Sequence, residues 1–381
     1  MKKMLAVLLV LLVAGSVFAG GGKEAGPLIG LAMPETHVQR WLKDGNGLKA
    51  EAEKRGYTAL VQWANADQVI QNGQIESYLV QGAKALVIGC ISEGVAPMVA
   101  QAKKDGVIVL AYDRLIQNSA DYDYFITFDN ARVGTFQGQA IVTALDLDKA
   151  TTAAPKNITL FAGSSTDANA PVFFDGAMAV LNPYIDKGVL KVVGPYPKTS
   201  ADRQNFLRIA TENWSAQVAK TRMENLLNGD ARNVTLDAVL APNDPIARSI
   251  IEALKADAKY RTKLPVVTGQ DAELKSITSI KNGEQYMTVY KDTGKLAEAA
   301  IILVDQLLKG QTVNIPGATL ATGAYATQLG DTTAGGRFPN GKTVKTYILP
   351  PTVITKSNFD VPIKAGFYSG DEAAEAAQLL K

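Results

Sequence analysis

The chain has 381 residues, of which 47% are hydrophobic and 20% charged, and its 39 Lys and Arg nearly balance its 37 Asp and Glu. This length suits two domains with ordinary buried cores. The charge balance excludes the strongly basic surface expected of a protein that binds nucleic acid or acidic membranes. A single cysteine, Cys90, excludes an intramolecular disulfide, and a single histidine, His37, argues against zinc sites and Ser-His-Asp hydrolysis.

The first 19 residues have the pattern of an export signal. Lys2 and Lys3 precede the apolar run 4–13, and residues 15–19 contain a small-x-small cleavage pattern. The apolar run is too short to span a bilayer. We therefore expect cleavage near Ala19 and an exported mature protein.

Segments typical of strands and of helices alternate along the rest of the chain. Apolar runs predict strands at 28–33, 58–63, 85–90, 107–112, 124–128, 157–161, 190–193, 236–240, 264–268, 287–290, 346–349 and 352–355. Helical spacing predicts helices at 38–54, 67–81, 95–104, 132–145, 171–181, 214–227, 246–256, 295–308 and 371–381. In the second helix, Val69, Ile70, Ile75 and Leu79 are expected to face inward. This alternation predicts an α/β protein with two doubly wound parallel sheets.

The alternation stops between Gly310 and Gly341, where Thr, Gly and Ala are abundant and we expect an irregular surface excursion. Residues 336–343 match the pattern of a phosphate-binding loop. However, they lack the preceding strand and following helix that would aim backbone amides at a phosphate. No GxGxxG motif follows a predicted strand. The sequence therefore predicts neither a nucleotide site nor a cofactor.

Polar side chains follow the carboxyl ends of the predicted strands, which is where open α/β sheets bind their ligands. Asp113 and Arg114 follow the strand 107–112, and no helical period comes after them, so Asp113 is not expected to cap a helix. Asp129 and Asp292 directly precede predicted helices, and we interpret both as N-caps. For Asp271 the two interpretations, ligand site and cap, stay open.

The charges at these strand ends do not suit a phosphate. The acidic members Asp113, Asp167, Asp244 and Asp271 face the basic members Arg40, Arg114 and Lys291, so positive charge is not in excess. Donors and acceptors mixed in this way can bridge the neighbouring hydroxyls of a neutral polyol. The aromatic residues nearby in sequence are Trp41, Tyr112, Phe173, Phe174 and Trp214. Core packing explains each aromatic alone, but together they fit the apolar face of a sugar ring.

Four segments resemble one protein family in their order and spacing: 110–116 (LAYDRLI), 127–130 (TFDN), 269–273 (GQDAE) and 288–291 (TVYK). The chain resembles the periplasmic monosaccharide-binding proteins of ABC transporters, and most closely their xylose-binding and multiple-sugar-binding, chemoreceptor-type branch. The resemblance runs from about 29 to 308 and resumes at 342–368. It departs from the xylose-binding pattern at Pro34-Glu35-Thr36-His37, so the sugar itself is left open.

The resemblance implies a type I periplasmic binding protein fold, with two α/β lobes joined by a three-segment hinge and a sugar clamped between them. It implies a first lobe of 28–130 plus about 292–324, and a second lobe of 131–291 plus about 342–381. The implied sugar contacts are Arg40, Asp113 and Arg114 from the first lobe, Asp167, Asn169, Trp214, Asn243 or Asp244, and Asp271 from the second, and Lys291 near the hinge. Trp41 or Trp214 would stack on the sugar ring.

The function implied is that of a monomeric periplasmic receptor without catalysis, cofactor or metal, which delivers a pentose or hexose to a membrane ABC permease. A chemotaxis or sensor protein is a further candidate partner. The alternative is a secreted carbohydrate-active enzyme. A glycosidase needs a carboxyl group with a raised pKa, whereas Arg114 would lower the pKa of the neighbouring Asp113. A sugar-sensing repressor core would need an N-terminal helix-turn-helix, where this chain has an export signal.

Overall fold

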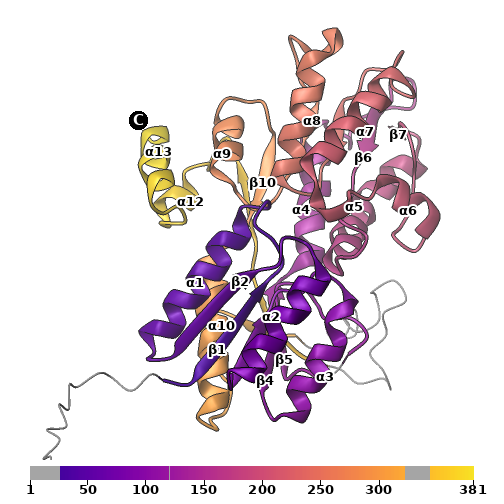
Figure 1. Cartoon of the computed structure of the whole chain (residues 1–381). Coiled ribbons are helices and arrows are strands. Elements are labelled where there is room, and N and C mark those ends of the chain that lie inside the picture. The colour runs from indigo at the N-terminus through magenta and orange to yellow at the C-terminus, as the bar shows by residue number, and fades with distance from the viewer. Residues whose placement is uncertain (1–25, 120, 322–343) are drawn as a thin grey trace, which may run out of the picture.

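The computed structural model describes residues 26–119, 121–321 and 344–381, and these form two α/β lobes (Figure 1). The predicted export signal, the phosphate-loop match and most of the predicted excursion lie outside the described residues. Within the described parts, no helix combines the length and apolar character needed to cross a membrane. The predicted fold class is confirmed by the two sheets and the helices around them.

The first lobe is built on a seven-stranded sheet with the order β11-β12-β5-β4-β3-β1-β2. Its strands are β1 (Leu28–Met33), β2 (Thr58–Trp63), β3 (Ala85–Ile88), β4 (Ile108–Tyr112), β5 (Tyr124–Phe128), β11 (Thr319–Leu320) and β12 (Lys345–Leu349). Its helices are α1 (Arg40–Lys54), α2 (Gln68–Val80), α3 (Ala96–Lys104) and α10 (Thr293–Leu308), with a 3-10 turn η1 (Glu93–Val95). All pairs are parallel except β11 with β12. The strands β3 and β4 are almost wholly buried, as their continuous apolar runs predict.

The second lobe has a four-stranded parallel sheet, β7-β6-β8-β9, and a separate antiparallel pair, β10 with β13. Its strands are β6 (Lys156–Leu160), β7 (Leu190–Val192), β8 (Ala238–Leu240), β9 (Val266–Val267), β10 (Met287–Tyr290) and β13 (Thr352–Thr355). Its helices are α4 (Asn130–Ala144), α5 (Asn169–Asp186), α6 (Arg203–Ile209), α7 (Ala216–Asn228), α8 (Asp244–Ala256), α9 (Leu274–Lys281), α12 (Val361–Lys364) and α13 (Asp371–Leu379), with 3-10 turns η2 (Glu212–Trp214) and η3 (Ala258–Tyr260). Figure 1 shows these helices above the first lobe, with α12 and α13 at the outer side.

The chain crosses between the lobes at 128–130, 290–293 and 349–352, which join β5 to α4, β10 to α10 and β12 to β13. The third crossing corrects the expected division of the chain. The whole of 342–381 was expected in the second lobe, but β12 pairs in parallel with β5 throughout its length. Because Tyr347 and Leu349 are buried and pair with β5 of the first lobe, the crossing comes only after them, at Pro350-Pro351.

The prediction that Val69 and Ile70 of helix α2 face the core is wrong. Val69 and Ile70 are 81% and 47% exposed, whereas Ile75 is fully buried as expected. The buried stripe of α2 is formed by Gln71, Ile75 and Tyr78, at helical spacing. Gln71 takes an inward position because its side-chain amide donates to the Gly89 carbonyl and its oxygen accepts from a backbone amide. The buried face of α2 therefore includes the polar residue Gln71, whereas Val69 and Ile70, which the hydrophobic pattern predicted to face inward, are exposed.

Candidate functional site

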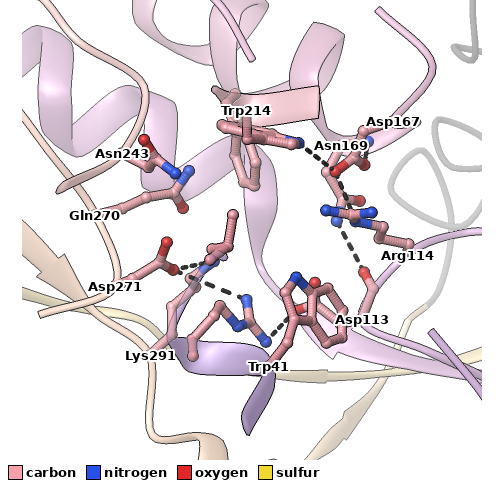
Figure 2. Close-up of a pocket in the computed structure, with 13 residues that line it drawn as sticks. Trp41, Asp113, Arg114, Asp167, Asn169, Trp214, Asn243, Gln270, Asp271 and Lys291 are labelled. Carbon is pink, nitrogen blue, oxygen red and sulfur yellow. Dashed lines mark hydrogen bonds and ion pairs between the residues drawn. The ribbon is translucent and has the colours of Figure 1, made fainter. Parts of the chain in front are cut away.

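A cavity of about 300 Å³ lies between the two lobes, and Figure 2 shows the residues around it. The lining residues are Val38, Arg40, Trp41, Asp113 and Arg114 from the first lobe, Asp167, Asn169, Phe173, Trp214, Asn243, Gln270 and Asp271 from the second, and Lys291 at the hinge. Both lobes therefore supply charged groups and aromatic rings to the same cavity.

Asp113 is held at the end of β4 by its backbone. Its φ of 61° lies in the left-handed region, where a non-glycine residue is strained unless its surroundings fix it. Its amide donates to the Ile126 carbonyl, and its own carbonyl accepts from the Thr127 hydroxyl (2.9 Å) and the Asn169 side chain (2.8 Å). The turn fixes the carboxylate at the cavity, so Asp113 is not a helix cap, as predicted.

Asp271 occupies a similar backbone turn in the second lobe. Its φ is 94°, and its amide donates to the Val289 carbonyl on β10. The residue that precedes α9 in the cap position is Glu273, so Asp271 does not cap this helix. This excludes the cap, one of the two interpretations that the sequence left open for Asp271. Its carboxylate pairs instead with the Lys291 ammonium at 2.9 Å.

Arg40 joins the carboxylates of both lobes. Its Nε donates to Asp44 and its Nη2 to Asp113, both at 2.9 Å, and its Nη1 lies 3.8 Å from Asp271 Oδ1. Burial would lower the pKa of Arg40, but Asp113, Asp44 and Asp271 outweigh burial and raise it. Burial would likewise raise the pKa of Asp113, but Arg40, Lys291 and Arg114 hold it below its usual value. Arg40 and Asp113 therefore carry full charges at neutral pH.

Arg114 makes a second bridge between the lobes. Its Nε lies 2.8 Å from Asp167 Oδ2 in the second lobe, and its Nη2 donates to Glu35 in the first lobe at 2.9 Å. Asp167 also accepts from the Asn169 amide (2.9 Å) and from Trp214 Nε1 (3.1 Å). Burial raises the pKa of Asp167 by more than Arg114 and these donors lower it. Figure 2 shows Arg114, Asp167 and Asn169 close together at one side of the cavity.

Two tryptophans provide apolar faces at opposite sides of the cavity, with Trp214 above and Trp41 below in Figure 2. The guanidinium carbons of Arg40 and Arg114 lie 4.9 and 5.0 Å from the centre of the Trp41 ring. Trp214 packs edge-on against Phe173, with 6.3 Å between ring centres. Both guanidinium groups therefore lie within cation–π distance of Trp41.

Asp244 is the one predicted site residue that does not line the cavity; the other predicted site residues do. Asn243 caps α8, because its Oδ1 accepts from the Ile246 amide at 3.2 Å. Asp244 begins that helix and lies behind the cavity wall, fully buried, where it accepts from Gln285 (2.8 Å) and from the Glu273 amide (2.9 Å). Burial raises the pKa of Asp244 to about 8, with the charge of Glu273 contributing.

Gln270 lines the cavity and was not among the predicted site residues. Its Nε2 donates to the Pro242 carbonyl at 2.7 Å, whereas its Oε1 is buried without a hydrogen-bond partner. A buried acceptor without a donor favours a ligand that brings one. The sequence could have indicated Gln270 as a site residue, because it directly precedes Asp271 after a predicted strand. Among the described residues, no three His, Cys, Asp or Glu side chains gather in a way that could hold a metal ion.

Comparison with known proteins agrees with this architecture. A family model described as a periplasmic binding protein domain matches residues 29–312. The chain belongs to this family. It is 37% identical over 350 residues to the multiple sugar-binding periplasmic receptor of Rhizobium radiobacter, covering 90% of this chain and 91% of the relative. It is 36% identical over 346 residues to the D-xylose-binding periplasmic protein of Escherichia coli, covering 90% and 92%.

A periplasmic binding protein of known structure has the same two-lobe fold. It is an ABC transporter solute-binding protein from Clostridium phytofermentans with bound β-D-glucose, 36% identical to this chain, with a TM-score of 0.79. The match covers 91% of this chain and 99% of that one. The family and the branch indicated by the four sequence segments are thereby confirmed.

Proposed function

We propose that this protein is a periplasmic receptor that binds a monosaccharide between its lobes and delivers it to a membrane ABC permease. The observation that carries the proposal is the cavity itself, where ion-paired carboxylates and cations from both lobes meet two tryptophan faces. The relatives support it, because two are named for binding multiple sugars or D-xylose and a third holds β-D-glucose.

The chemistry of binding follows from the groups on each side of the cavity. Arg40, Arg114 and Lys291 donate to ring and hydroxyl oxygens, while Asp113 and Asp271 accept from hydroxyls. Charge-assisted hydrogen bonds of this kind are stronger than neutral ones and fix the orientation of the sugar. The tryptophans cover its C–H faces. Because the sugar contacts both lobes only when they meet, it shifts the population towards the closed form that the permease receives.

A carbohydrate-active enzyme is the alternative that we do not favour. The general acid of a glycosidase must hold a proton next to the scissile bond. Asp113 is kept ionised by Arg40, Lys291 and Arg114. Asp167 has a raised pKa, but its Oδ2 already accepts from Arg114 and Trp214 and its Oδ1 from the Asn169 amide. Neither carboxyl group is arranged to give a proton to a leaving group.

A periplasmic location is supported by the relatives, which are named as periplasmic proteins. We propose that residues 1–19 direct export and are removed near Ala19. The mature protein would act as a monomer, and a chemotaxis or sensor protein would be a second reader of its closed form.

A thermal-shift screen of the mature protein against pentoses and hexoses tests the proposed function. At a hundredfold excess over its dissociation constant, a sugar that binds only the folded state adds about 2.7 kcal/mol to the free energy of unfolding. We expect one or a few monosaccharides to raise the melting temperature and to be recovered unchanged. Conversion of the sugar would favour the enzyme, and no shift with any sugar would refute the receptor.

A further inference from the structure

His37 lies between the lobes at the edge of the interface, outside the set of side chains that line the cavity. Its Nε2 is 2.7 Å from the Asn213 carbonyl oxygen in the second lobe and 2.9 Å from Glu35 Oε2 in its own lobe. The side chain is 45% exposed, whereas Glu35 is buried. The single histidine of the chain thus contacts the opposite lobe and remains accessible to protons from solvent.

The carbonyl that His37 meets belongs to a rigid turn next to the sugar cavity. Asn213 and Trp214 both have positive φ angles, 51° and 54°, which turn the backbone sharply. The Asn213 amide donates to the Ser164 hydroxyl at 3.2 Å, which fixes the turn from behind. Trp214 follows immediately and forms one wall of the cavity. A contact to Asn213 therefore acts on the segment that places this wall.

We propose that His37 is a positioning residue, a clasp that holds the lobes together over bound sugar through the Asn213 carbonyl without contacting the sugar. The proposal rests on the proposed function, since the clasp matters only if a ligand is enclosed. Both neighbours of Nε2 are acceptors, so this nitrogen carries a hydrogen and the proton gained or lost in titration is the one on Nδ1. The imidazolium form binds a carboxylate and a carbonyl more strongly than the neutral ring does.

The charges around His37 determine the sign of its pH dependence. The hydrogen bond to Glu35 raises the pKa of His37, burial opposes it, the Asn213 carbonyl raises it further and the charge of Arg114 lowers it. Glu212, beside Asn213, faces the Ser164 hydroxyl at 3.3 Å. Glu35 and Arg114 belong to the same lobe as His37, so the contact with Asn213 is the part made only when the lobes meet. This contact acts to raise the pKa of His37 in the closed form, so we expect the clasp to be strongest at low pH and to weaken as pH rises through that pKa.

The test is the pH profile of sugar dissociation, measured by stopped flow between pH 5.5 and 8.5 with a monosaccharide that the screen identifies. We expect the wild-type dissociation rate to rise about three- to tenfold across this range, as one net hydrogen bond predicts. His37→Gln keeps a neutral donor but cannot titrate, so the ratio of the wild-type dissociation rate to the His37→Gln rate should rise across the range and approach one at pH 8.5. Thr36→Ala is the matched control, because the Thr36 hydroxyl donates only within its own lobe, to Asn65.

The variants separate this proposal from other sources of pH dependence. Asp244 also titrates near the upper end of the range, but its contribution is common to wild type and His37→Gln and cancels in their ratio. A ratio that does not change with pH would overturn the clasp, even if both proteins bind sugar. Absence of sugar binding by the wild type would instead refute the proposed function. Loss of binding by Thr36→Ala would show that the loop matters for its fold and would also overturn the specific role of His37.

Discussion

Arg114 contacts buried carboxylates of both lobes at once. Its guanidinium reaches Glu35 in the first lobe and Asp167 in the second, and its Nη1 donates to the Cys90 carbonyl at 3.4 Å. The side chain is itself buried, so each of these contacts is shielded from solvent. A group that links the lobes in this way stabilises the closed form and the bound sugar together.

Replacing Arg114 by alanine should therefore weaken sugar binding by at least tenfold, about 1.4 kcal/mol, measured by isothermal titration calorimetry. The physical reason is the loss of a charged donor and of the bridge to Asp167. Arg261→Ala removes an exposed arginine that does not line the cavity and serves as the matched control. Circular dichroism should show native secondary structure in both variants. Unchanged affinity of Arg114→Ala would assign Arg114 a purely structural role.

Asp244 should make the protein less stable as pH rises. Its pKa is about 8 in the folded protein, above the ordinary value near 4 of an unfolded chain. Between these two values the folded state holds a proton that the unfolded state has released, so the free energy of unfolding falls with increasing pH. Asp244→Asn removes this titration. Urea denaturation at pH 5 and pH 8 should show a smaller loss of stability in the variant, and equal losses would contradict the assignment.

The behaviour of single residues shows what the sequence could and could not predict. Asp129 and Asp292 were expected to be N-caps, and both are, because each accepts from a backbone amide in the first turn of the next helix. The resemblance left Asn243 and Asp244 as alternatives, and only Asn243 lines the cavity, because it is the extended N-cap residue whereas Asp244 already belongs to helix α8. A strand-end position predicts proximity to the site, whereas the direction of a side chain depends on the helix that follows.

At the scale of elements, apolar runs predicted the bounds of several strands correctly, whereas helical spacing did not predict the short helices. The strands at 28–33, 58–63, 124–128, 287–290 and 352–355 have the predicted bounds. The helices α6, α9 and α12 were not predicted, since segments of four to eight residues contain too few turns to show a helical period. Helix α5 continues to Asp186 although Pro183 lies inside it, five residues beyond the predicted end. Packing against other elements decides such cases.

Helices α4 and α5 approach each other closely enough that their backbones nearly touch. A Cβ added to Gly134 would lie 1.9 Å from the Phe173 carbonyl oxygen, and one added to Gly176 would lie 2.3 Å from the Ala131 carbonyl oxygen. Phe173 lines the cavity, so the position of α5 relative to α4 sets part of the site. Both contacts involve backbone atoms, which cannot rotate away as a side chain can.

Gly134→Ala should accordingly destabilise the protein by about 1–3 kcal/mol and weaken sugar binding by displacing Phe173. Gly73→Ala is the matched control, because Gly73 lies in α2 with open space around it. Alanine there should stabilise the helix by about 0.5–1 kcal/mol and leave binding unchanged. Chemical denaturation and calorimetry measure both effects. A Gly134→Ala protein as stable as the wild type would show that α4 and α5 can move apart freely.

At the scale of the whole molecule, three chain crossings connect the lobes, and charged pairs join the lobes across the cavity. A sugar can change the angle between the lobes only to the extent that it binds the closed form more tightly than the open one. The pair between Arg114 and Asp167 belongs to the closed form alone, because its members come from different lobes. Weakening it should therefore shift the conformational equilibrium even where the sugar contacts remain.

Small-angle X-ray scattering should show this shift directly. Saturating sugar is expected to reduce the radius of gyration of the wild-type protein. Asp167→Asn should be more extended before sugar is added and should need about tenfold more sugar to reach the same compact form, because one charge-assisted contact is lost. Asp186→Asn is the control, since it removes a carboxylate paired with Lys198 at the surface. If the wild type binds sugar tightly without any change in radius, binding does not require the lobes to close.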